Sequence, residues 1–478
     1  MSLTKATYSM IEGAPVNVLD YGAVGDGVAN DTAAIQAAIN SSNGFNAVYF
    51  PTGTYKITSQ ITISNDRVML YGDGSASRIL FNPTTNAVCF LFDKGSTSSV
   101  QNTIRDLTFY STDTTYTKTA IKLVNVSQCL VENIHTIFPH WFGNGSIFLH
   151  ILGRDSTAIR GLNVFADKPI KASPIPAPHV AAGIGIDHFH FSDCYLGNTT
   201  SANPLITFDD GVIISNVTFD GYQAWVGGSH GFYWNAPTPT QSSLNLSFNN
   251  VRWEQPNSGG YVAYVAPVNS IVGVSFTNCY SSDAGVGAKG YYLRNTDQLA
   301  FRTVFYTGPG EGLNVDATCS GGDFDLLLND PAATFAMTAT RASGVIRRGG
   351  NVFNYAPNAP AGAGVTQNWN PSKTLGFSQL EPKTFSVGAT STEAFSDNTL
   401  RGLVLIYSSF NTSAIMAVNG SSNSTKLLSE SDAGWFGTTL GAANFNLYWD
   451  AGTSTYRLQN TLGSSASFWV VTMGAGER

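Results

Sequence analysis

Three acidic residues, Asp220, Glu254 and Asp283, lie at related positions of a sequence repeat and are the first candidates for chemistry. Glycosidases commonly use two carboxyl groups, about 5–5.5 Å apart for retention and about 6.5–9.5 Å apart for inversion, one of which is the general acid. Strands of one sheet lie about 4.8 Å apart, so carboxylates on adjacent coils of a solenoid can reach either distance. Their mutual repulsion also raises one pKa. We therefore expect Asp220 and Glu254 to form a catalytic pair, with Asp283 beside it.

The repeat consists of eight short segments in which Asn, Asp or a small residue lies between apolar residues, as in VENI at residues 131–134. Their third residues are spaced by 27, 28, 32, 23, 34, 28 and 25 positions, which fits one coil of three short strands. Asn, Asp and Gly tolerate the left-handed conformation of a bend, and neighbouring Asn side chains are expected to form a hydrogen-bonded ladder. The eight predicted bend residues are Asp106, Asn133, Gly161, Asp193, Asn216, Asn250, Asn278 and Thr303.

Strand alternation then sorts the residues that follow each bend. The residue directly after the bend is predicted to point into the core. This inward column is Leu107, Ile134, Leu162, Cys194, Val217, Val251, Cys279 and Val304. The residue four positions after the bend points outward, and this column is Tyr110, Ile137, Phe165, Gly197, Asp220, Glu254, Ser282 and Thr307.

Aromatic and polar residues around the acids predict a sugar-binding surface, because sugar rings stack on aromatic side chains while polar groups fix their hydroxyls. Some of these residues lie two positions after a bend, and others lie in the insertion GYQAWVGGSHGFYWNAP. The predicted substrate-binding residues are Arg252, Trp225, His230, Tyr233, Trp234, Tyr195 and Tyr280. Arg252 is expected either to pair with an acidic sugar or to pair with Glu254.

Other interpretations of these residues stay open. Exposed acids on a solenoid can be solvated surface, and loop aromatics can pack against another subunit. A polysaccharide lyase would use the same acids with Arg252 as the base, and a site between subunits is a further alternative. The weaker candidates for the site are Asp209, Asp210, Asp187, His188 and His190.

Neither a metal nor a cofactor is expected. The segment GDGVANDT lacks the downstream acidic ligand of a calcium loop, so Asp20, Asp26 and Asp31 are predicted to be turn and cap residues. The two histidines of DHFH lack a third ligand nearby.

Composition excludes several classes of protein. Only 12% of the 478 residues are charged and 48 are Gly, which is typical of many turns and not of a helix-rich fold. The net charge of −7 argues against a nucleic-acid partner. No apolar run is long enough for membrane insertion, and the N-terminus has no apolar export segment. The five scattered cysteines predict free core thiols in a reducing cytoplasm.

The elements that must position the site begin with residues 16–57. Asn30 or Asp31 is predicted to cap a short helix in which Ile35 and Ile39 share a face that plugs the end of a solenoid, and AVYF follows as a strand. The motifs DYGA, GDG, DTAAIQAAI and VYFPTGTY resemble the opening segment of the pectate-lyase-like superfamily. The lead-in SLTKATYSMIEGAPVNVLDYGA is similar to that of bacteriophage tail proteins.

This resemblance implies an all-β fold: a right-handed single-stranded parallel β-helix with an N-terminal capping helix, usually a homotrimer, that binds and often cleaves bacterial surface polysaccharide. We therefore expect a phage tailspike that depolymerises a capsule or O-antigen, most simply as an endoglycosidase. A lyase and a non-catalytic adhesin are the alternatives. The expected location is the virion tail, made in the host cytoplasm, with another tail or baseplate protein as a further partner.

The C-terminal part of the chain is predicted to be a separate domain. A Gly-, Pro- and Asn-rich linker precedes several strand-like segments, among them the hairpin NLYWDAGTSTYRLQN. An antiparallel β-sandwich is expected, with trimer stabilisation as its role and carbohydrate binding as the alternative. The predicted parts are the lead-in 1–15, the β-helix 16–348, the linker 349–372 and the sandwich 373–478.

Overall fold

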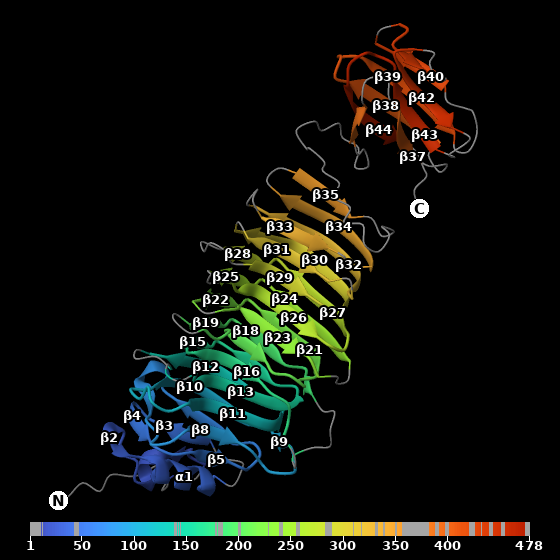
Figure 1. Cartoon of the computed structure of the whole chain (residues 1–478). Coiled ribbons are helices and arrows are strands. Elements are labelled where there is room, and N and C mark those ends of the chain that lie inside the picture. The colour runs from blue at the N-terminus through green and yellow to red at the C-terminus, as the bar shows by residue number, and fades with distance from the viewer. Residues whose placement is uncertain are drawn as a thin grey trace, which may run out of the picture. The chain divides into compact units, whose positions relative to one another are not determined.

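The structure is a computed structural model of the whole chain (Figure 1). It describes residues 11, 13–42, 47–137, 141, 143, 145–176, 179, 185–198, 202–227, 229–238, 242–254, 259–282, 289–308, 310–316, 318–329, 333–337, 340–348, 351–355, 382–387, 392–396, 401–419, 426–431, 433–438, 443–450 and 455–473. The chain divides into two compact units, residues 1–349 with 353–365, and residues 366–478 with 350–352.

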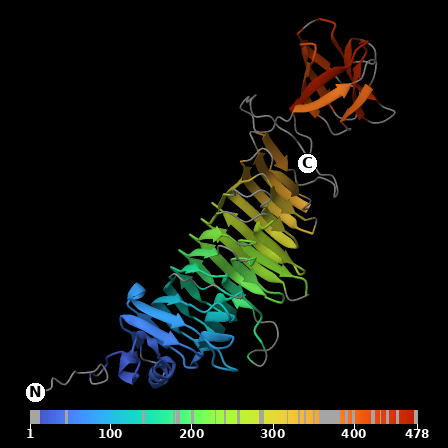
Figure 2. The same cartoon turned by 60° about the vertical axis from the view of Figure 1, so that its left-hand side comes forward.

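The first unit is a parallel β-helix in which 35 strands form one continuous hydrogen-bonded array (Figures 1 and 2). Each coil visits three sheets in turn. The first sheet contains β1 (Val16–Asn17), β3 (Ala47–Phe50), β6 (Met69–Gly72), β14 (Ala158–Arg160), β18 (His190–Ser192), β21 (Ile214–Asp220), β24 (Ser243–Asn249) and β27 (Ile271–Thr277). The second contains β2 (Asp26–Asn30), β4 (Gly53–Ile57), β7 (Ser77–Phe81), β15 (Asn163–Phe165), β19 (Tyr195–Asn198), β22 (Gln223–Val226), β25 (Arg252–Glu254) and β28 (Tyr280–Ser282).

The third sheet follows the second within each coil. It contains β5 (Ile61–Ile63), β8 (Ala87–Phe92), β11 (Lys118–Ser127), β13 (Ile147–Asp155), β16 (Lys168–Ala172), β20 (Ile206–Phe208), β23 (Phe232–Ala236), β26 (Tyr261–Pro267), β29 (Lys289–Leu293), β31 (Glu311–Val315) and β33 (Thr334–Met337). The remaining strands of the array are β9 (Ser99–Val100), β10 (Thr103–Tyr110), β12 (Leu130–Thr136), β17 (Ile186–Asp187), β30 (Thr296–Thr307), β32 (Ser320–Leu328), β34 (Thr340–Arg348) and β35 (Asn351–Tyr355). Some long strands, such as β10, belong to both the first and the second sheet.

Two rows of left-handed residues make the bends of the solenoid. The row that leads into the first sheet is Gln101, Gln128, Ser156, His188, Asn216, Asn245, Gly273 and Gln298. The row that leads into the second sheet is Asp106, Asn133, Gly161, Asp193, Gly221, Asn250, Asn278 and Thr303. The predicted side-chain ladder is present: Asn278 Nδ2 donates to Asn250 Oδ1 at 3.3 Å, and Asn133 Nδ2 donates to Asp106 Oδ1 at 3.1 Å.

The predicted repeat was wrong at one coil. Asn216 belongs to the first row of bends, and Gly221, five residues later, is the member of the second row. With Gly221 in place, the irregular spacings of 23 and 34 become 28 and 29. The error arose because both rows accept Asn, so residue type alone could not distinguish them. Tyr222, which is 1% exposed, therefore takes the place of Val217 in the inward column that follows the second row.

The solenoid core is apolar and rich in stacked rings. One stack runs along the inner face of the first sheet: Phe219 and Phe248 have centroids 5.1 Å apart, and Phe248 and Phe276 have centroids 5.0 Å apart. All five cysteines are free and buried, which confirms the predicted core thiols. Burial raises the pKa of the Cys194 thiol to about 12, so this thiol stays protonated.

The N-terminal end of the solenoid is covered by helix α1 (Thr32–Ser41), as expected (Figure 1). The first unit also contains two short 3-10 turns, η2 (Val18–Tyr21) before α1 and η3 (Gly74–Ala76) after β6. Ile35 and Ile39 are buried in the core. Asp31 is the N-cap residue by position, but its carboxylate accepts hydrogen bonds from Val24 N at 2.7 Å and Gly25 N at 3.3 Å. It thereby fixes the preceding loop.

The second unit is antiparallel except for one parallel pair of strands, and it has its own core. One sheet has the order β36 (Pro382–Val387), β44 (Ala466–Met473), β38 (Arg401–Ser408), β39 (Ser413–Asn419) and β40 (Lys426–Glu430). The other has the order β37 (Thr392–Ser396), β43 (Thr455–Asn460), β42 (Phe445–Asp450) and β41 (Phe436–Gly437). Phe445, Leu447 and Phe468 are fully buried in the shared core. The predicted all-β fold class is confirmed, as is the antiparallel pairing of β42 with β43.

No helix among the described residues is both long enough and apolar enough to cross a membrane.

Candidate functional site

The structure does not bring Asp220 and Glu254 together in one column, and this prediction was wrong. Asp220 ends a strand of the first sheet and pairs with Asn249. Glu254 lies beyond the bend on β25 of the second sheet, where it pairs with Trp225 and Ser282. Asp220 Oδ1 instead accepts a hydrogen bond from Asn250 Nδ2 at 3.0 Å. The misassigned bend at Asn216 caused the error, because it shifted Asp220 by five positions.

Glu254 lies in a patch on the outer face of the second sheet that contains several predicted residues. Arg252 Nη2 lies 2.8 Å from Glu254 Oε1, and the Arg252 guanidinium lies 5.8 Å from the centre of the Tyr280 ring. Trp225 pairs with Glu254 in register, and Tyr195 lies two strands before Arg252. Asp283 directly follows Ser282 but lies outside the described residues. The second-sheet patch is therefore Tyr195, Trp225, Arg252, Glu254 and Tyr280.

The other three predicted binding residues lie on β23 and in the residues just before it, and they split between core and surface. Trp234 is 1% exposed and packs inside the solenoid, so its predicted binding role was wrong. The reason is the alternation of β23, which turns Phe232 and Trp234 inward and leaves Tyr233 half-buried on the outer face. Tyr233 belongs to the third sheet and His230 lies two residues before β23, whereas Glu254 belongs to the second sheet.

Three tyrosines in register form a row on the outer face of the third sheet. Tyr233 pairs with Tyr264, and Tyr264 pairs with Tyr292. The ring centroids of Tyr233 and Tyr264 are 5.2 Å apart, and those of Tyr264 and Tyr292 are 4.6 Å apart. Both pairs are stacked, and each ring is half-buried. We call Tyr233, Tyr264 and Tyr292 the tyrosine row.

Polar groups border the tyrosine row on one side. His230 stacks on Tyr233 with a centroid distance of 4.8 Å, and its Nδ1 accepts a hydrogen bond from Tyr261 N at 2.9 Å. The Tyr261 hydroxyl donates to Glu311 Oε2 at 3.0 Å, and Lys289 Nζ lies 5.0 Å from the Tyr261 ring centre. Burial and Lys289 lower the pKa of His230 to about 4, so His230 is neutral at pH 7. Burial and Glu311 raise the pKa of Tyr261 above its usual value.

The same outward row continues toward the N-terminus as a charged cluster. Tyr233 pairs with Thr207, Thr207 with Lys171, Lys171 with His150 and His150 with Lys122. A chain of polar contacts joins the cluster to the end of β20. His150 Nε2 lies 2.8 Å from Ser173 Oγ, Ser173 Oγ donates to Asp209 Oδ2 at 2.6 Å, and Lys171 Nζ lies 2.9 Å from the same oxygen. We call Lys122, His150, Lys171, Ser173 and Asp209 the His150 cluster.

His150 is held in its neutral form. Burial, together with the positive charges of Lys122 and Lys171, lowers its pKa to about 3. The Ser173 hydroxyl donates its one proton to Asp209, so its oxygen accepts from His150 Nε2. Nδ1 is therefore the ring nitrogen that carries the free lone pair, and it can accept a proton.

Sequence reasoning missed most of this third-sheet face. Asp209 was only a weak candidate, and Lys122, His150 and Tyr264 were not singled out. A signal was present, because each outward residue lies between apolar neighbours, as in IKL at 121–123, LHI at 149–151 and AYV at 263–265. Aligning these triplets would have revealed the row without any use of the bends.

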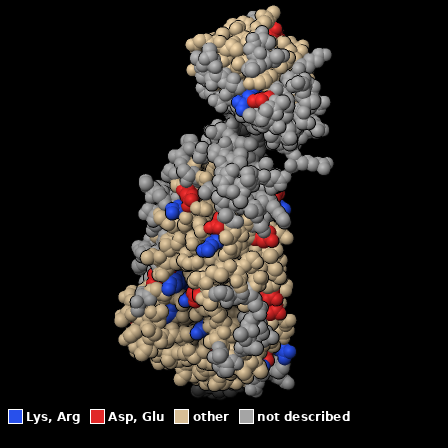
Figure 3. Space-filling view, turned by 45° about the vertical axis from the view of Figure 1, so that its right-hand side comes forward, with Lys and Arg blue, Asp and Glu red and all other residues tan. Residues whose placement is uncertain are grey.

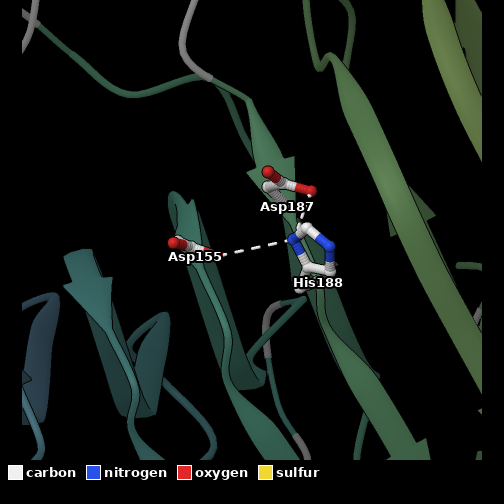
Figure 4. Close-up of side chains that lie close together, drawn as sticks. All are labelled: Asp155, Asp187 and His188. Carbon is white, nitrogen blue, oxygen red and sulfur yellow. Dashed lines mark ion pairs between the residues drawn. The ribbon is translucent and has the colours of Figure 1, made fainter.

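The first row of bends contains another cluster, Asp155, Asp187 and His188 (Figure 4). His188 Nδ1 lies 2.8 Å from Asp187 Oδ1 and 3.6 Å from Asp155 Oδ1. The side chains are 42–58% exposed, so water competes strongly with any ion held there. His190 lies in a strand of the first sheet and is not part of this cluster.

Comparisons with known proteins agree with the architecture. Residues 15–223 match the family model described as rhamnogalacturonase A/epimerase, pectate lyase-like. Mannuronan C5-epimerase AlgE1 of Azotobacter vinelandii is 54% identical over 44 residues, which are 9% of this chain and 3% of that protein. The chain thus spans only a small part of the length of this relative.

Two solved structures of viral proteins cover most of the chain. The gp42 tailspike of Acinetobacter phage vb_AbaP_AS12 has a TM-score of 0.55 at 11% identity, over 91% of this chain and 86% of that chain. The ORF18 protein of Geobacillus virus E2 has a TM-score of 0.47 at 18% identity, over 94% and 85% of the two chains. The sheet topology is that of a parallel β-helix, and residues 15–223 are similar to the pectate-lyase-like family.

Proposed function

We propose that this protein is a phage tailspike that binds and depolymerises a bacterial surface polysaccharide, either a capsule or an O-antigen. The observation that carries the proposal is the tyrosine row, bordered by His230, Glu311 and the His150 cluster. Stacked half-buried rings with hydrogen-bonding groups at their edges suit a chain of sugar rings. The shared fold with a phage tailspike is compatible with this function.

The reaction has two candidates on two different faces. Hydrolysis by an endoglycosidase would use Glu254 as one carboxyl group, held by Arg252 at 2.8 Å. Its partner would be Asp283, which follows the strand neighbour of Glu254, since Asp220 lies in the first sheet. Retention or inversion then depends on the distance between the two carboxyl groups.

Elimination is the second candidate, and the His150 cluster favours it. His150 Nδ1 would accept the C5 proton of an acidic sugar whose carboxylate is neutralised by lysine. The electron pair of the C–H bond becomes the C4=C5 double bond, the C4–O bond breaks, and His150 returns the proton to the leaving oxygen. Atoms and charges balance with no further reactant.

A panel of purified bacterial capsular and O-antigen polysaccharides tests the function. New reducing ends and the ultraviolet absorbance of an unsaturated product are followed together. Reducing ends without absorbance would support hydrolysis and direct attention to Glu254→Gln. Both signals would support elimination and direct attention to His150→Gln. Binding without either signal would refute depolymerisation and leave an adhesin, and no binding to any polysaccharide of the panel would refute the proposal.

A homotrimer is part of the proposal, as is a second tail or baseplate protein that attaches it to the virion. Sedimentation of the purified full chain measures its oligomeric state directly. A monomer at micromolar concentration would contradict it.

A further inference from the structure

We infer that the His150 cluster binds the carboxylate of an acidic sugar, and that the tyrosine row binds the sugars that follow it along the same chain. This inference rests on the proposed function and adds to it the substrate class, a polysaccharide that contains uronic or other carboxylated sugars.

The first step is the imbalance of charge around His150. Three lysines, Lys122, Lys168 and Lys171, act on His150, where Asp209 opposes them, and Asp167 also acts on Lys168. Lys171 is paired with Asp209, whereas neither Lys122 nor Lys168 makes an ion pair within the described part of the chain. Burial and the repulsion from Lys171 lower the pKa of Lys168, and attraction to Asp209 and Asp167 offsets part of this effect. A bound anion would relieve this repulsion.

The second step is that His150 does not contribute to the charge. Its pKa of about 3 leaves it neutral at physiological pH, so the positive potential comes from the lysines alone and is present throughout the neutral range. In the space-filling view, several Lys and Arg side chains lie in the lower half of the visible face, with Asp and Glu side chains beside some of them (Figure 3). A local group of lysines concentrates an anionic ligand.

The third step is the continuity of the two surfaces. Lys122, His150, Lys171, Thr207 and the tyrosine row follow one another in register on consecutive strands. At about 4.8 Å a strand, the six steps from Lys122 to Tyr292 span roughly 29 Å, enough for several sugar units. One polysaccharide chain lying across the strands can therefore contact the lysines and the rings together.

Lys122 is the best residue to vary because it forms no ion pair with a described carboxylate, so replacing it breaks no ion pair among the described residues. Lys122→Met keeps the length of the side chain and removes the charge, and Lys122→Arg restores the charge. Lys56→Met is the matched control: it makes the same change in net charge on β4 of the second sheet. Thermal unfolding of each variant checks that it is folded.

The probe is the polysaccharide bound best in the panel, native and after its carboxyl groups have been reduced to alcohols. We expect Lys122→Met to weaken binding of the native polysaccharide about tenfold at low salt and to reduce the salt dependence, with Lys122→Arg and Lys56→Met near wild type. The reduced polysaccharide should bind weakly and equally to wild type and Lys122→Met.

Three results would overturn the inference while leaving the proposed function intact: a neutral polysaccharide as the best ligand, unchanged affinity after carboxyl reduction, or unchanged affinity of Lys122→Met. Failure of wild type to bind any polysaccharide would instead refute the proposed function itself.

Discussion

Single residues at the bends of the solenoid determine its register. Asn250 has a φ of 53°, donates to Asp220 Oδ1 at 3.0 Å and accepts from Asn278 Nδ2 at 3.3 Å. Asn250→Ala loses these bonds and leaves a β-carbon in the left-handed region, whereas Asn250→Gly loses the bonds only. We expect the alanine variant to be less stable than the glycine variant by about 1–2 kcal/mol. Equal denaturant midpoints for the two variants would show that the bend carries no such strain.

Also at the scale of the residue, the lowered pKa of His150 predicts how the free energy of unfolding depends on pH. Its pKa is about 3 in the folded protein, where Lys122, Lys168, Lys171 and Asp209 face it, and about 6.5 in the unfolded chain. Below pH 6.5 the unfolded chain therefore binds a proton that the folded protein does not, and stability falls as the pH falls toward 3. The slope from this one group is at most about 1.4 kcal/mol per pH unit.

His150→Gln removes this titration and keeps a donor toward Ser173. We expect its unfolding midpoint to fall less than that of wild type between pH 6.5 and pH 4. His230, with a pKa of about 4, titrates over much of the same range and stays in both proteins, so it cancels in the comparison. Parallel profiles for wild type and the variant would mean that His150 is not held neutral by its surroundings.

At the scale of the strand, the fold could be predicted from the sequence more completely than the site. The helix at residues 32–41, the bends with Asn and the buried cysteines could all be predicted, because each depends on local spacing. The register of Asp220 could not, since two rows of bends share the same residue types five positions apart. The tyrosine row was missed because its members come from three coils separated by loops of unequal length.

We predict that the polysaccharide binds to the outer face of the third sheet, where the tyrosine row lies. Replacing any one of Tyr233, Tyr264 and Tyr292 by Ala removes a stacking surface worth roughly 1 kcal/mol, so each variant should bind the polysaccharide about fivefold more weakly. The matched control is Tyr71→Ala. Tyr71 stacks on Tyr49 with a centroid distance of 5.0 Å, but on the first sheet. A loss of affinity in the control equal to that in the row would contradict the assignment of the face.

At the scale of the whole molecule, the two units have separate cores and are expected to have separate tasks. The second unit buries Phe445, Leu447 and Phe468 in a core of its own. We predict that it stabilises the trimer, so a chain that ends at residue 372 should keep the circular-dichroism signal of its β-helix but lose trimers at low concentration. A truncated chain that sediments as a stable trimer would place the trimer contacts in the solenoid instead.

The central claim is that one outer face of the solenoid, from Lys122 to Tyr292, holds an acidic polysaccharide. The most direct measurement is a crystal structure of the full chain with an oligosaccharide released from, or prepared from, its polysaccharide ligand. We predict sugar density across the third sheet, with a carboxylate near Lys122 and Lys171 and rings against Tyr233 and Tyr264. Density confined to the second sheet beside Glu254 and Tyr280, or to a groove between subunits, would contradict the account.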